Sequence, residues 1–62
     1  MDFELENHFS IYLLRPITDV ARDWVAENLP DDAQHFGGAV VVEHRFIADI
    51  VRVARADGLV VR

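Results

Sequence analysis

Hydrophobic and polar residues alternate along the first fourteen positions, which is the period of a β-strand. The apolar parity holds Phe3, Leu5, Phe9, Ile11 and Leu13. Asn7 is the one polar residue on that parity, so the best-supported strand runs from His8 to Leu14, and Arg15-Pro16 ends it because proline has no N–H for a strand ladder. Tyr12 falls on the polar parity, so it is expected to face solvent if the helices cover the opposite face.

Apolar residues then recur at three- and four-residue spacing, which predicts a helix that ends near Leu29. Thr18 is a suitable N-cap, Asp19 suits the positive end of the helix dipole, and Pro30 stops the helix. The apolar stripe consists of Val20, Ala21, Trp24, Val25 and Leu29. We assign Trp24 to the core rather than to an exposed stacking surface.

The second half of the chain predicts a loop, a strand, a helix and a last short strand. Residues 31–38 form the loop, in which Gly37-Gly38 gives the backbone the freedom to re-enter the sheet. The β-branched run Ala39 to Glu43 is a strand. A helix follows from about His44 to Asp57-Gly58, with an apolar stripe of Phe46, Ile47, Ile50, Val51 and Ala54. Leu59 to Val61 is short enough to be only a strand.

This order, strand-helix-strand-helix-strand, predicts one domain over residues 1–62. The fold class is a two-layer α/β (α+β) miniprotein, with two helices on one face of a three-stranded sheet. If the last two strands are neighbours, a right-handed crossover makes them parallel. The direction of the first strand is left open, and an antiparallel or mixed sheet is compatible with the pattern.

Charge is unevenly distributed along this acidic chain, whose net charge is −5. Residues 1–34 hold eight acids against Arg15 and Arg22, a formal charge of −6, whereas residues 35–62 have a charge of +1. Proteins that bind DNA directly neutralise phosphates with clustered Lys and Arg. A direct nucleic-acid partner is therefore not expected.

The acids fall into rows that predict a candidate binding surface. On the first strand the row is Asp2, Glu4 and Glu6, and on the first helix it is Asp19, Asp23 and Glu27, extended by Asp31 and Asp32. Such rows have about half the charge density of one DNA strand. They suit a partner with a DNA-binding channel, and the alternative is an ordinary solubilising surface. A second alternative is contact through Arg45, Arg52 and Arg55.

Motifs for catalysis or cofactors are not found. The three histidines, His8, His35 and His44, lack the spacing of a metal site, and the chain has no cysteine. Ser10 beside His8 lacks the setting of a nucleophile. We therefore expect no enzyme activity, no cofactor and no metal. No apolar run approaches the ~20 residues that cross a bilayer, so a cytoplasmic protein is expected.

Two blocks, HFSIYLLRPITDVARDWVAENLPDD and FGGAVVVEHRFIADIVRVARADGLVVR, resemble small proteins of phages and other bacterial mobile elements. In particular, the chain resembles type I anti-CRISPR proteins, most nearly those directed at the type I-C system. The resemblance implies stoichiometric binding, in the bacterial cytoplasm, to a protein subunit of the CRISPR surveillance complex or to its nuclease-helicase. Such binding blocks either target recognition or recruitment. Anti-CRISPR proteins share no common motif, so the resemblance assigns no residue a role.

Two further expectations accompany this resemblance. The protein is expected to be a monomer or a weak homodimer. The alternative function is a small regulatory or antitoxin-like interaction module of a mobile element, whose partner is another small protein.

Overall fold

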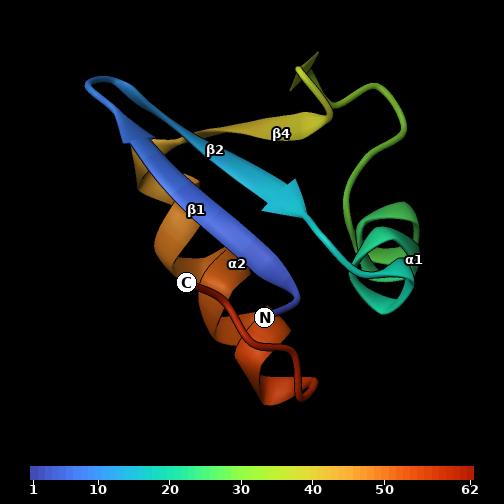
Figure 1. Cartoon of the computed structure of the whole chain (residues 1–62). Coiled ribbons are helices and arrows are strands. Elements are labelled where there is room, and N and C mark those ends of the chain that lie inside the picture. The colour runs from blue at the N-terminus through green and yellow to red at the C-terminus, as the bar shows by residue number, and fades with distance from the viewer.

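The computed structural model describes residues 1–62 as a four-stranded antiparallel sheet and two helices (Figure 1). The elements are β1 (Phe3–His8), β2 (Ile11–Pro16), α1 (Asp19–Asn28), β3 (His35–Phe36), β4 (Ala39–Glu43) and α2 (His44–Ala56). The strand order across the sheet is β1-β2-β4-β3. The predicted α+β class is therefore correct at a coarse level, and the predicted three-stranded sheet is wrong.

The first polar and apolar alternation is a hairpin rather than one strand. His8 pairs with Ile11, which leaves Phe9 and Ser10 as a two-residue turn between β1 and β2. Phe9 has a φ of 48° and is the only non-glycine residue with a positive φ. Glycine and asparagine are the usual residues at such a position, so the sequence carries no ordinary turn signal there.

Because the turn has two residues, the residues that face the helices have odd numbers in β1 and even numbers in β2. Leu5 pairs with Leu14 and Asn7 pairs with Tyr12, so odd residues of β1 share a face with even residues of β2. Directly opposed residues in an antiparallel pair lie on the same face of the sheet. Tyr12 consequently lies on the helix-covered face with its ring 4.7 Å from that of His44, and the prediction that it faces solvent is wrong.

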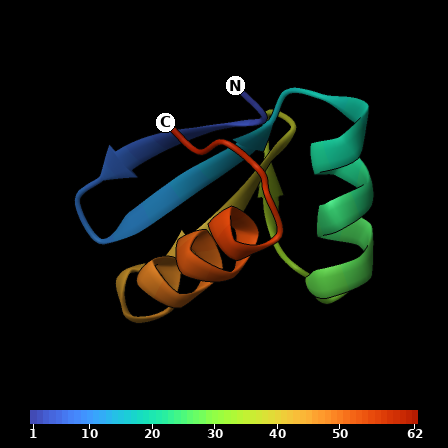
Figure 2. The same cartoon turned by 90° about the horizontal axis from the view of Figure 1, so that it is seen from below.

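Both helices begin and end where the sequence predicts. The Thr18 hydroxyl oxygen accepts a hydrogen bond from the N–H of Ala21 at 3.1 Å, which caps α1. Helix α2 follows β4 directly, and Gly58 has a φ of 90° after its last turn. The helices lie on the same side of the sheet, and no helix covers the other side (Figure 2).

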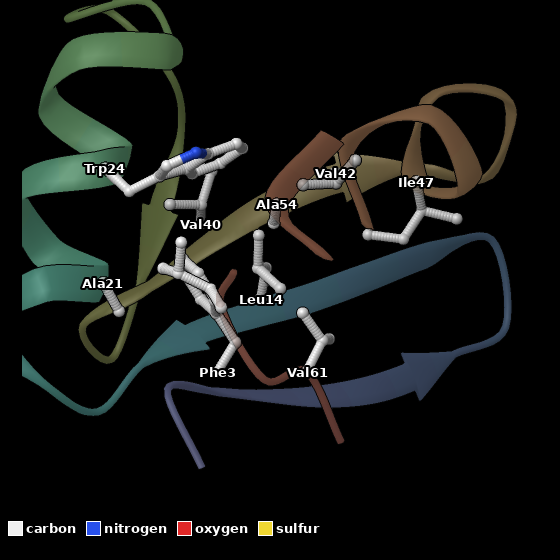
Figure 3. Close-up of a cluster of buried hydrophobic side chains, with 10 residues drawn as sticks. Phe3, Leu14, Ala21, Trp24, Val40, Val42, Ile47, Ala54 and Val61 are labelled. Atoms are coloured by element: carbon white, nitrogen blue, oxygen red, sulfur yellow. The ribbon is translucent and has the colours of Figure 1, made fainter. Parts of the chain in front are cut away.

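The core lies between the sheet and the two helices (Figure 3). Its largest fully buried side chains are Phe3 and Leu14. The ring of Phe3 meets that of Trp24 edge to face, with 5.8 Å between centroids. The assignment of Trp24 to the core is confirmed, and its indole N–H donates to the carboxylate of Asp57 at 2.8 Å.

Two residues of the predicted helix stripes are exposed instead. Val20 has 62% of its surface exposed and Phe46 has 48%. Each directly precedes the buried residue that defines the inward face, Ala21 in α1 and Ile47 in α2. One residue rotates a helix by about 100°, so these two side chains lie at the edge of the buried stripe.

The C-terminal residues pair with β1 and not with β4. Val61 forms a single parallel bridge with Phe3, and the N–H of Arg62 donates to the Phe3 carbonyl at 3.0 Å. The predicted third strand is therefore reduced to one bridge beside the first strand. The condition for a parallel pair with Ala39–Glu43 is not met, because β1 and β2 lie between that strand and the C-terminal segment.

Candidate functional site

The acidic side chains divide into those with an intramolecular partner and those without one. Seven of the eleven acids accept a hydrogen bond or form an ion pair. They are Asp2, Glu4, Glu6, Asp19, Glu43, Asp49 and Asp57. This division shows which acids are available to a second molecule.

Asp2 joins three segments of the fold. Its carboxylate accepts the N–H of Val60 and the hydroxyl of Thr18, each at 2.8 Å. The hydrogen bond from Val60, followed by that from Thr18, holds the pKa of Asp2 below its ordinary value. The sequence placed Asp2 in an acidic surface row, and the structure places its carboxylate in contacts within the protein.

Glu4 and Glu6 lie on the face of the sheet that no helix covers, where Glu4 is directly opposite Arg15 and Glu6 is opposite Leu13. The guanidinium is 3.8 Å from Glu4 and 3.7 Å from Glu6, and it also donates to the carbonyl of Gly37. The ring nitrogen of His8 lies 3.0 Å from Glu6, and this hydrogen bond is the main reason that the pKa of Glu6 is lowered. Both glutamates therefore have an intramolecular partner, and Arg15 offsets part of their charge.

The acids of α1 and the following loop are different. Asp19 pairs with Arg22 at 2.8 Å, but Asp23, Glu27, Asp31 and Asp32 have no hydrogen-bond or ion-pair partner within the protein. All four are exposed. We call these four residues the free acidic stretch, and no arginine or lysine occurs between Asp23 and Asp32 to neutralise it.

The arginines proposed as an alternative contact surface are engaged within α2 and its ends. Arg45 pairs with Glu43 at 3.4 Å, and Arg52 pairs with Asp49 at 3.6 Å. Arg55 donates to the Val61 carbonyl at 3.4 Å. Each of these side chains remains exposed, so the surface is mixed in charge.

Exposed aromatic side chains are the feature that sequence reasoning missed. Phe9 is 99% exposed at the tip of the β1–β2 hairpin, and Phe36 is 68% exposed. Phe36 pairs with Ala39 and so shares the open face of the sheet with Leu13 and Val41. The sequence predicted one strand with a single apolar side. The turn at Phe9 and Ser10 instead makes two strands, and the odd-numbered apolar residues of β2 lie on the open face.

The side chains considered for metal binding or catalysis do not lie together at one site. No three side chains of histidine, cysteine, aspartate or glutamate are placed to hold a metal ion. His8 ends β1, His35 lies in β3 and His44 begins α2. Ser10 lies in the exposed turn after His8 rather than in a strand. Neither helix has the length and apolar character needed to span a membrane.

Comparisons of the chain with protein-family models, with curated proteins and with solved structures find no match.

Proposed function

We propose that this protein is a stoichiometric inhibitor that binds a type I-C CRISPR surveillance complex and blocks its binding of target DNA through the free acidic stretch. The observation that carries the proposal is the segregation of uncompensated charge. The four acids without an intramolecular partner all fall between residues 23 and 32. The target itself is suggested by the resemblance of the two sequence blocks to anti-CRISPR proteins.

The geometry of α1 suits such a contact. Asp23 and Glu27 are four residues apart, which places their carboxylates on one face of the helix about 6 Å apart along its axis. Like charges at this spacing destabilise a helix by a few tenths of a kcal/mol. The arrangement therefore gives no benefit to the helix itself and becomes favourable when cations of a second molecule approach.

The expected mechanism is competition for basic side chains that bind DNA phosphates. Charges on the rim of an interface mainly increase the association rate, and their effect decreases with salt because the Debye length shortens. The inhibitor would therefore bind faster at low salt. Target DNA and protein would exclude each other from the complex.

The test is DNA binding by a purified type I-C surveillance complex across a salt series, with and without the protein. The double variant Asp23→Asn/Glu27→Gln is expected to inhibit about tenfold less at low salt, from ~0.7 kcal/mol for each lost exposed charge pair. The matched control is Glu4→Gln/Glu6→Gln, which removes the same charge from side chains that already pair with Arg15. Equal losses for both variants would show that net charge, and not the free acidic stretch, is responsible.

The open face of the sheet favours a second candidate function, a small antitoxin-like or regulatory interaction module. Phe36, Ile11 and Val41 line a hollow on this face, and aromatic and aliphatic side chains of this kind are common at protein interfaces. A toxin gene beside the coding gene would support this candidate, and CRISPR-associated neighbours would support the first. Binding of such a toxin that is lost in Phe36→Ala, without association with the surveillance complex, would also favour it.

A further inference from the structure

A hydrophobic groove lies beside the free acidic stretch, between the loop that follows α1 and the first turns of α2. It has a volume of about 350 Å³. Seven of its ten lining residues are hydrophobic, so the group that fills it must itself be apolar. We call it the α2 groove, and its principal lining residues are Leu29, Pro30, Ala33, Phe46 and Ile50.

The walls of the α2 groove are held by the core. Val40 and Val42 of β4 line it and are 2% and 5% exposed. Leu29, Ala33 and Ile50 are partly buried against the same core cluster. The groove therefore exists before any partner binds, and filling it requires little ordering of this chain, which favours affinity.

Phe46 forms the exposed rim of the groove. It is 48% exposed, and the guanidinium of Arg45 lies 4.9 Å from the centre of its ring. Burial of exposed apolar surface is favourable by about 25 cal/mol per Å². A partner side chain in the groove would cover Phe46, so this residue is the expected energetic centre of the contact.

The charges around the groove determine which apolar group fits. Asp31 and Asp32 lie in the chain between the lining residues Pro30 and Ala33 and have no ion-pair partner. On the opposite wall Glu43 and Asp49 line the groove, each paired with one arginine. The rim therefore carries net negative charge, which disfavours nucleic acid and anionic lipids and favours flanking cations.

We propose that the α2 groove receives one large apolar side chain from a segment of the partner protein that is rich in lysine and arginine. This inference rests on the proposed function, because Asp31 and Asp32 belong to the free acidic stretch. The acids guide the basic segment to the surface, and the apolar side chain supplies affinity that persists when salt screens the charges. Interfaces commonly combine a desolvated apolar anchor with a polar rim in this way.

The test is an NMR titration of the ¹⁵N-labelled protein with three blocked pentapeptides, Arg-Arg-Leu-Arg-Arg, Arg-Arg-Ser-Arg-Arg and Glu-Glu-Leu-Glu-Glu. The leucine peptide with arginines is expected to shift the amide signals of Ala33, Phe46 and Ile50. It should bind about tenfold more tightly than the serine peptide, from the burial of one leucine side chain. The glutamate peptide should not bind. Equal affinity of the leucine and serine peptides, or shifts confined to the open face of the sheet, would overturn the proposal.

Phe46→Ala provides the matched substitution, with Phe36→Ala as its control because that aromatic is exposed on a different face. Phe46→Ala should weaken the leucine peptide about tenfold and leave the serine peptide unchanged, whereas Phe36→Ala should change neither. Circular dichroism and thermal unfolding verify that both variants fold.

The outcomes separate this inference from the proposed function. Selective peptide binding without any effect on a surveillance complex would retain the groove and reject the CRISPR target. Inhibition of the complex that is unchanged in Phe46→Ala would retain the function and reject the groove.

Discussion

The backbone at the tip of the β1–β2 hairpin leads to a prediction of increased stability. Phe9 has a φ of 48° in a two-residue turn and is 99% exposed. A residue with a Cβ atom in the left-handed region costs about 1–2 kcal/mol relative to its usual conformations. Because the Phe9 ring is almost fully exposed, its removal loses almost no buried area.

Phe9→Gly removes this cost and adds one of its own. Glycine loses about 0.5–1 kcal/mol more backbone entropy on folding than alanine does. The difference is a net stabilisation of roughly 0–1.5 kcal/mol, with a central value of about 0.75 kcal/mol. For a domain of 60–100 residues, 1 kcal/mol moves the melting temperature by about 4–8 °C, so the central value corresponds to an increase of roughly 3–6 °C.

The assay is thermal unfolding followed by circular dichroism, with urea unfolding to give the free energy. Phe9→Ala is the control, because it removes the ring but keeps the Cβ atom and hence the backbone cost. Its stability should stay within about 0.5 kcal/mol of the original protein. A Phe9→Gly variant that is no more stable than Phe9→Ala would refute the reasoning.

Three further predictions concern the contacts that hold the fold. Asp2→Asn should flatten the decline of the unfolding free energy at acidic pH, measured by urea unfolding. The hydrogen bond from the Val60 N–H holds the pKa of the Asp2 carboxylate below the ordinary 3.8. The ionised carboxylate therefore stabilises the fold above pH 3.8, and this stabilisation is lost as the pH falls through the lower pKa of the folded state. An unchanged pH profile would contradict this role. Leu14→Ala should cost about 2–5 kcal/mol in urea unfolding, because Leu14 is 1% exposed, and a cost under 1 kcal/mol would contradict its place in the core. Asp57→Ala should cost about 0.5–1.5 kcal/mol and red-shift the fluorescence of Trp24, which loses its hydrogen-bond acceptor; an unchanged spectrum and stability would contradict this contact.

Local signals in the sequence were sufficient for the helices and for β4. The Thr18 cap, Pro30 and Gly58 act within a few residues of the helix ends that they define, so reading the chain locally finds them. The β1–β2 turn was missed because phenylalanine is not a turn residue. The hairpin forms there because the pairing of β1 with β2, and of β2 with β4, compensates a locally unfavourable turn.

The candidate site could likewise be predicted only in part from the sequence. Helical spacing was enough to place Asp23 and Glu27 on one face of α1. Sequence could not show that Asp2 accepts the N–H of Val60, because the two residues are 58 positions apart and meet only when the C-terminal segment reaches β1. It also could not show the α2 groove, which depends on how the loop after α1 approaches Phe46.

The pairing of the C-terminal residues with β1 has a consequence for self-association. Exposed strand edges promote aggregation, because their free N–H and C=O groups pair with strands of other molecules. Here the segment from Val60 to Arg62 hydrogen-bonds along the outer side of β1, and the opposite edge strand, β3, has only two residues. The segment thus occupies the position where a strand from a second molecule would otherwise add.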